Sequence, residues 1–144
     1  MLHELNGYYF EDLKVGMKAT VSRTITETDL RNFSGVSGDT NPMHLNEEFA
    51  MRTPFGGCIV HGMLTASLIS AVIGTKLPGP GCIYMNQTLK FLAPVRVGNT
   101  VYAVATVREL VQEKKRVMLT TQCFVKDILV IDGEALIKVP SRKT

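Results

Sequence analysis

The sequence predicts an α+β protein in which a curved antiparallel sheet of about five strands wraps around one buried central helix. Two observations carry this prediction. Residues 62–74 have no charge and show apolar side chains on every face of a helix, which is typical of a helix buried in a core. From residue 82 onward the apolar period changes to two, in four strand-length runs separated by turn signals.

The first third of the chain predicts one strand and one short helix. Residues 19–25 have strand length and composition. Thr26 and Asp29, three residues apart, form a capping-box pattern that begins a helix. Gly38 would end this helix and release a polar loop, and residues 46–51 would add one more helical turn. The residues expected to form the buried stripe of the first helix are Leu30, Phe33 and Val36.

The remaining elements form the core. The helix at 62–74 would be about 20 Å long, too short to span a membrane. The strands expected after it are 82–91, 100–110, 116–125 and 129–139. A sheet wrapped around a single apolar helix is the hot-dog architecture. Because one helix cannot cover such a sheet and its ends leave an edge unpaired, we expect a homodimer with the loop around Asp39 near the interface.

Composition narrows the class of protein. At 144 residues, with 45% apolar and 20% charged residues, the chain is expected to form a single domain, 1–144. The net charge of +3 and the small basic cluster at 114–116 argue against nucleic-acid binding. The three cysteines form no C-x-x-C pair, so neither a zinc cage nor a disulfide framework is expected. No secretory signal or membrane span is indicated, which favours a cytoplasmic protein, with the mitochondrial matrix as the alternative.

The segment FSGVSGDTNPMH, residues 33–44, carries the strongest functional signal. It holds Asp39, Asn41 and His44 within six positions, with Pro42 stiffening the link. A carboxylate and an imidazole on a stiff loop above a packed scaffold favour a site in which two bases hold one water, with Asn41 orienting them. The alternative is that Asp39 caps a turn and His44 is an ordinary buried imidazole. A metal site that adds His61 is not expected, because the spacing matches no ligand pattern.

His61 and Gly62 open the central helix. Glycine leaves a bare N–H at the positive end of the helix dipole, where it could stabilise a developing oxyanion, although close packing would also explain it. We interpret His61 as a structural hydrogen-bonding residue rather than a base. Ser67 and Ser70 share one face of the helix, where each could bond the preceding turn or contact a ligand.

Three segments of the chain resemble a known family. GDTNPMH, IVHGMLTASLIS and LPGPGCIYMNQTLKFLAPVRVGN are similar to the MaoC-like (R)-specific enoyl-CoA hydratases, also called hydratase 2. The resemblance extends over about residues 15–140. Every fixed position of the hydratase motif is filled, namely Gly38, Asp39, Asn41, Pro42 and His44.

The resemblance implies a hot-dog homodimer that reversibly hydrates trans-2-enoyl thioesters of CoA to (R)-3-hydroxyacyl products, without a metal or redox cofactor. Asp39 and His44 would activate water and handle the α-carbon proton, oriented by Asn41. The Gly62 N–H would hold the thioester oxygen, and Ser70 matches a family position at the active site. Phe33, Met63 and Leu64 are candidates for the pocket lining.

Three alternatives stay open at this point. A 3-hydroxyacyl-[acyl-carrier-protein] dehydratase would use the same chemistry on a carrier-protein thioester. A thioesterase would use the same fold. A non-catalytic acyl-CoA-binding module is disfavoured, because it would have little use for the full polar set and we expect no room for an added DNA-binding segment.

Overall fold

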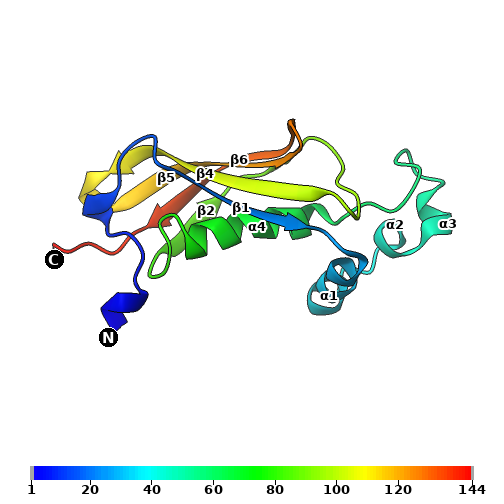
Figure 1. Ribbon diagram of the computed structural model, residues 1–144, viewed down its shortest axis with the longest axis horizontal. Coiled ribbons are helices and arrows are strands. Elements are labelled where there is room, and N and C mark those ends of the chain that lie inside the picture. The colour runs from blue at the N-terminus through cyan, green and yellow to red at the C-terminus, as the bar shows by residue number, and fades with distance from the viewer. Residues whose placement is uncertain (1, 144) are drawn as a thin grey trace.

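One antiparallel sheet and one long helix lying against it dominate the architecture (Figure 1). The computed structural model describes residues 2–143, so Met1 and Thr144, the two ends of the predicted domain, lie outside the described residues. The strands are β1 (Lys18–Thr24), β2 (Ile83–Gln87), β3 (Lys90–Phe91), β4 (Thr100–Val111), β5 (Arg116–Val125) and β6 (Ile128–Lys138). Their order in the sheet is β1-β4-β5-β6-β2, with β3 also paired to β6 and every pair antiparallel.

The predicted strand 82–91 is divided in two, so the sheet has six strands instead of about five. β2 and β3 both pair with β6, in the same register from Asn86 onward, and between them the ladder is interrupted at Thr88 and Leu89. The chain at Thr88 passes so close to Gly133 that a Cβ there would collide with the Thr88 carbonyl oxygen. Only glycine permits this approach, which explains an isolated glycine inside β6.

The helices are α1 (Glu27–Ser37), α2 (Pro42–Leu45), α3 (Glu47–Ala50) and α4 (Gly62–Thr75), with short 3₁₀ turns at Leu2–Leu5, Phe10–Asp12 and Gln112–Lys114. The capping box predicted for α1 is confirmed. Thr26 Oγ1 accepts the Asp29 N–H at 3.1 Å, and the Asp29 carboxylate accepts the Thr26 N–H at 2.9 Å. Hydrogen bonds from Arg23 are the main reason that the pKa of Asp29 falls to about 2.

The buried stripe of α1 is shorter than predicted. Leu30 and Ser34 are buried, Phe33 is half-buried, and Val36 is 86% exposed. Burial of Val36 was therefore a wrong prediction. In Figure 1 α1 lies below the right-hand end of the sheet, with α2 and α3 further out.

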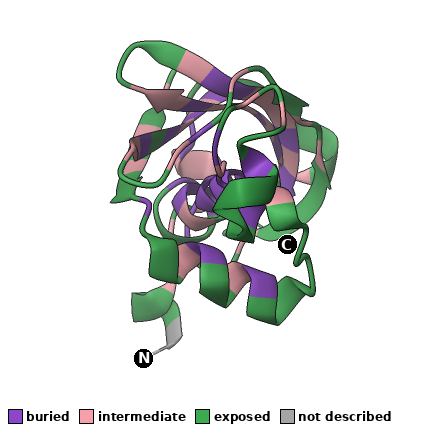
Figure 2. Cartoon of the chain, turned by 90° about the vertical axis from the view of Figure 1, so that its right-hand side faces the viewer, coloured by how far each residue is buried: buried purple, intermediate pink, exposed green. Residues whose placement is uncertain are grey.

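α4 packs against β1, β4 and β5. The residues of α4 that are buried are Thr65, Ala66, Leu68, Ile69, Val72 and Ile73. In Figure 2 the buried residues concentrate in the centre of the molecule, whereas its near end is largely exposed. A strip of α4 that contains Met63, Ser67 and Ser70 remains exposed, because one sheet covers only one side of a helix.

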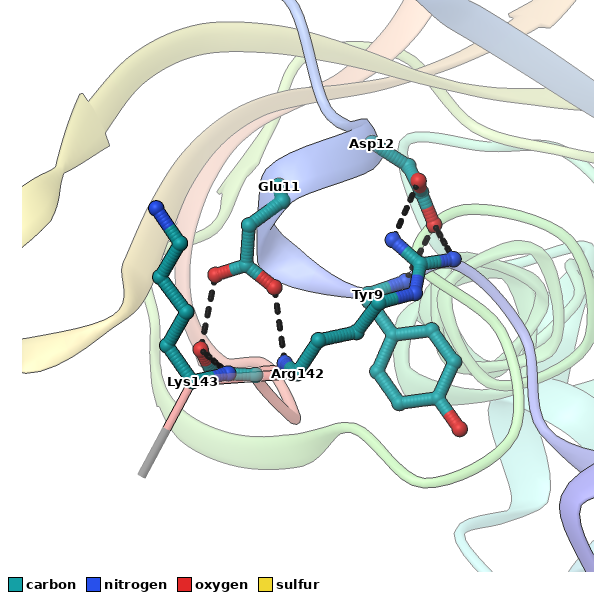
Figure 3. A network of polar contacts seen from close by, with 6 residues as sticks. Tyr9, Glu11, Asp12, Arg142 and Lys143 are labelled. Atoms are coloured by element: carbon teal, nitrogen blue, oxygen red, sulfur yellow. Dashed lines mark hydrogen bonds and ion pairs between the residues drawn. The ribbon is translucent and has the colours of Figure 1, made fainter.

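The two chain ends meet at the end of the molecule opposite α1–α3 (Figures 1 and 3). Arg142 donates to both carboxylate oxygens of Asp12, at 2.7 and 3.1 Å, and its guanidinium lies 4.4 Å from the centre of the Tyr9 ring. Glu11 accepts from the Ser141 hydroxyl and the Arg142 N–H. These five residues, here named the terminal clasp, tie the N-terminal turn to the segment after β6.

No helix within residues 2–143 combines the length and the apolar character that crossing a membrane requires.

Candidate active site

The segment between α1 and α2 is held in shape by its own short-range hydrogen bonds. Gly38 ends α1 with a φ of 80°, a conformation that glycine adopts without strain. The Asn41 N–H donates to Asp39 Oδ1 at 3.2 Å, and Asn41 Oδ1 accepts the Met43 N–H at 3.1 Å. Asn41 thereby caps α2, where Pro42 occupies the first turn. The main-chain N–H of Asn41 thus contacts the Asp39 carboxylate, while the Asn41 side chain caps α2.

His44, on α2, is buried, and its hydrogen bond defines its tautomer. Its Nδ1 lies 2.8 Å from the main-chain carbonyl oxygen of Ile59. A carbonyl oxygen only accepts hydrogen bonds, so Nδ1 carries the proton of the neutral ring. In this tautomer the lone pair lies on Nε2.

His61 is buried more deeply, between α1, α2 and the loop. Its ring stacks on that of His44, with centroids 3.9 Å apart and planes inclined by 26°. Its Nε2 lies 3.0 Å from Ser34 Oγ and 3.2 Å from the carbonyl oxygen of Asp39. Burial is the main reason that the pKa of His61 lies below the ordinary histidine value. These contacts agree with the prediction that His61 is a structural hydrogen-bonding residue.

Asp39, His44 and His61 form a compact polar cluster. Each brings one oxygen or nitrogen to within 4.8 Å of the other two. Stacked imidazoles direct their in-plane lone pairs side by side rather than toward one point, which is a poor geometry for joint coordination of a metal ion. A carboxylate beside an imidazole with a free lone pair suits the exchange of protons with a water.

The start of α4 lies beside this cluster. Gly62 is the first residue of α4, so its N–H belongs to the first turn, whose N–H groups have no partners within the helix. A Cβ at this position would lie 2.7 Å from two atoms of the Phe91 ring. Any larger residue here would therefore displace the Phe91 ring, and the helix dipole adds partial positive charge at the same place. The two interpretations of Gly62 are compatible.

A cavity of about 470 Å³ opens beside Gly62. Asp39, His61, Gly62 and Met63 form one part of its lining. The remaining lining is mostly apolar and consists of Phe55, Ile59, Val60, Thr65, Phe91, Leu92, Ala93, Pro94, Val95 and Ile131. His44 is not among the lining residues of this cavity. An apolar cavity whose lining includes a carboxylate and a helix N-terminus is suited to a molecule with a hydrocarbon chain and a polarisable carbonyl group.

The structure brings together Asp39, His44 and the start of α4, as predicted. Met63 lines the cavity, whereas Phe33 and Leu64 are not among its lining residues. The Phe33 ring instead packs against the His61 ring, at a centroid distance of 4.9 Å. Ser70 lies on the exposed strip of α4, outside the cavity lining, so its contact with a substrate stays a prediction.

Sequence reasoning missed several contributors to the site. The Ile59 carbonyl holds His44, and a main-chain group leaves no signal in a sequence. The sequence does not distinguish Ser34 from any other helix residue. The structure places its hydroxyl 3.0 Å from His61 Nε2. Phe91 ended the predicted strand 82–91, but the contact of its ring with Gly62 joins residues far apart in the sequence and leaves no local pattern.

Comparison with known proteins places the chain in a family. Residues 11–127 match the family model described as a MaoC like domain. The chain belongs to the MaoC-like family. It is 56% identical over 135 residues to the (R)-specific enoyl-CoA hydratase of Rhodospirillum rubrum, covering 94% of each protein. It is 52% identical over 143 residues to the 3-hydroxybutyryl-CoA dehydratase of Methylorubrum extorquens, covering 99% of this chain and 91% of that protein.

The fold of this MaoC-like protein is also found in a solved structure. The unliganded R-hydratase PhaJ1 of Pseudomonas aeruginosa superposes with a TM-score of 0.89 at 43% identity, covering 96% of this chain and 89% of that one. The predicted α+β hot-dog class is thus confirmed.

Proposed function

We propose that this MaoC-like protein is an (R)-specific enoyl-CoA hydratase, which adds water reversibly to trans-2-enoyl-CoA. The observation that carries the proposal is that Asp39 lines an apolar cavity at the start of α4 and lies in one polar cluster with His44 and His61. The names of the two relatives, at 52% and 56% identity, support the same reaction class.

The geometry suggests how the reaction would proceed. The thioester oxygen would bind the Gly62 N–H, where the helix dipole stabilises the charge that develops on it. The oxygen of a water would bond to carbon 3 of the enoyl chain while a proton is delivered to carbon 2, so that one H₂O is added. Asp39 and His44 would remove the proton from this water and supply the proton to carbon 2. Asn41 would orient Asp39.

The acyl chain would occupy the apolar cavity, with Met63 in its wall. Phe33 would act indirectly, through its contact with His61. Ser70 is two turns of α4 from Gly62 on the exposed strip, so it would reach a bound substrate only if a second copy of the chain completes that part of the site. No metal or redox cofactor is proposed, because the thioester itself delocalises negative charge from carbon 2.

The decisive assay follows crotonyl-CoA and free thiol in the same sample. A hydratase would lower the enoyl absorbance without releasing thiol, and the product would be (R)-3-hydroxybutyryl-CoA by chiral analysis. Thiol release would indicate a thioesterase instead. Binding without any turnover would indicate an acyl-CoA-binding module, and an (S) product would contradict the stereochemical part of the proposal.

We propose CoA, rather than a carrier protein, as the thiol that carries the acyl chain. The alternative is a 3-hydroxyacyl-[acyl-carrier-protein] dehydratase, which shares every step at the cluster. The kcat/KM values for one acyl chain on CoA and on carrier protein separate the two, and at least tenfold preference for CoA is expected under our proposal, about 1.4 kcal/mol of discrimination. A preference for the carrier-protein thioester would favour the alternative.

We also propose that the protein works as a homodimer. The sheet has two open edges, and that of β2 presents the exposed apolar side chains of Ile83, Tyr84 and Met85. An apolar sheet edge is suited to pairing with a second copy about a two-fold axis. Light scattering should give a mass of two chains, and Met85→Lys should shift it toward one. A monomeric mass for the unsubstituted protein would overturn this part.

A cytoplasmic location completes the proposal, in keeping with two bacterial relatives whose names refer to CoA thioesters. Fractionation of the source cells tests it, and recovery in the membrane or exported fraction would contradict it.

A further inference from the structure

His61 contacts every part of the site that the proposed chemistry uses. Its ring lies between the rings of Phe33 on α1 and His44 on α2, at centroid distances of 4.9 and 3.9 Å. Its Nε2 lies within hydrogen-bond distance of Ser34 Oγ and of the Asp39 carbonyl. The next residue, Gly62, begins α4. One side chain thus connects the acid–base loop to the proposed oxyanion donor.

We propose that His61 is the positioning residue that holds Asp39 and His44 in register with the start of α4. This inference rests on the proposed hydratase function and deepens it.

The tautomer of His61 follows from its partners. The Asp39 carbonyl can only accept, so His61 Nε2 carries the proton and donates it toward Asp39, with Ser34 Oγ as a second acceptor. This bond acts on the main chain of Asp39 and leaves its carboxylate free. The His61 ring face meanwhile limits the movement of the His44 ring, which the Ile59 carbonyl already holds at Nδ1. Both members of the proposed pair are therefore restrained by His61.

A purely structural role explains the choice of histidine less well. His61 is the N-cap residue of α4, but its side chain makes no capping hydrogen bond. Its Nδ1 is buried and has no hydrogen-bond partner among the described residues. Leaving a buried acceptor unpaired is unfavourable, so an apolar residue would serve packing alone better. The contacts that justify histidine here are the Nε2 bond and the ring stack, and both reach the site.

The same observations argue against direct chemistry by His61. Its ring nitrogens are either hydrogen bonded or enclosed, so neither is presented to a molecule in the cavity. Burial is the main reason that the pKa of His61 is lowered, which favours the neutral form of its ring. His61 would act through its neighbours.

The test separates the two contacts with three variants. His61→Phe keeps an aromatic ring but removes the donor, His61→Gln keeps an N–H donor near the position of Nε2, and Ser34→Ala removes one acceptor. Steady-state hydration of crotonyl-CoA gives kcat and KM, and butyryl-CoA, which has no double bond to hydrate, gives a dissociation constant. Melting temperatures report the fold.

We expect His61→Phe to lower kcat about 100-fold with KM and the butyryl-CoA constant changed by less than about threefold, because a displaced acid–base pair slows the reaction more than binding. His61→Gln should recover about tenfold of this loss, and Ser34→Ala should lose about threefold to tenfold. A matched control is Thr121→Val, which removes a buried hydroxyl that accepts from Gln87 at 2.9 Å in the sheet. It should lower the melting temperature but leave kcat unchanged.

Three results would overturn the inference: folded His61 variants with kcat within about threefold of the unsubstituted protein, a loss confined to KM, or His61→Gln no better than His61→Phe. If His61→Phe does not fold, full kcat in both His61→Gln and Ser34→Ala would overturn it equally. Inactivity of the unsubstituted protein on crotonyl-CoA is a different outcome, because it removes the proposed function itself.

Discussion

The two ends of the molecule use polar groups in opposite ways. At the terminal clasp every charged group has a charged or polar partner close by, and the residues are solvent-exposed or partly so (Figure 3). At the other end His61 is buried with an unpaired Nδ1, and the Nδ1 hydrogen bond of His44 leaves its Nε2 available. The clasp is satisfied within itself, whereas the site retains hydrogen-bonding capacity for another molecule.

The two polar clusters differ in how much of their hydrogen-bonding capacity is used. Arg142, Asp12 and Glu11 saturate one another, and their hydrogen bonds lower the pKa values of both carboxyl groups. The site is held mainly by neutral hydrogen bonds to main-chain carbonyls, which orient the side chains without using all of their donors and acceptors. The number of polar contacts does not distinguish the candidate site from the clasp. The distinguishing feature of the candidate site is its unused lone pairs.

The largest expected effect is loss of turnover when the pair is removed. Asp39→Ala and His44→Ala should each lower kcat for crotonyl-CoA at least about 100-fold, the usual scale of acid–base contributions. The fold should persist, because Asp39 is exposed and α2 is held by the Asn41 cap. Circular dichroism provides the control. Near-normal turnover in either variant would contradict the assignment of Asp39 and His44 as the acid–base pair.

The next effect concerns the start of α4. Gly62→Ala would place a methyl group 2.7 Å from the Phe91 ring, which must move aside. We expect kcat/KM to fall about tenfold or more, because the thioester oxygen would lose its alignment with the N–H. Phe91→Ala in the same chain should restore part of the loss by removing the obstacle. If the double variant is no better than Gly62→Ala, packing against Phe91 is not the reason for glycine.

A smaller effect, on stability, is expected at the start of α1, a helix at the same end of the molecule as the candidate site. Asp29→Ala should lower the free energy of unfolding by about 1 kcal/mol at neutral pH. The pKa of Asp29 falls from 3.8 to about 2 on folding, so the unfolded chain takes up the proton first as pH drops. The contribution is thus fully present above about pH 4 and lost toward pH 2. Denaturant unfolding of both proteins across this range measures it. A difference that persists unchanged at about pH 2 would contradict it.

The smallest effect is expected at the clasp. Arg142→Ala should lower the melting temperature slightly and leave kcat unchanged, because exposed ion pairs contribute little. Since the pKa of Asp12 is lowered in the folded protein, the contribution is present at neutral pH and lost as pH falls below the ordinary aspartate value. High salt should also reduce it. Any marked change in kcat would contradict the separation between the two ends.

The sequence alone determined much of this protein. The period change at residue 82 indicated the meander, the capping box indicated the start of α1, and the DTNPMH segment identified Asp39 and His44 as the candidate pair. These features depend on local chemistry: side-chain periodicity, helix capping and the stiffness of a proline. Each can be read from residues within a few positions of one another.

Tertiary structure decided the rest, because it depends on which distant groups meet. The tautomer of His44 depends on a carbonyl 15 residues away, and the partner of His61 lies 27 residues away on α1. The close approach of Thr88 to Gly133 joins two separate segments of the chain, and the exposure of Val36 is seen only once α1 is placed in the fold. Main-chain acceptors and close approaches leave no pattern in a sequence. Local sequence chemistry identified Asp39 and His44 as the candidate pair, whereas packing between distant segments determined how the two side chains are held.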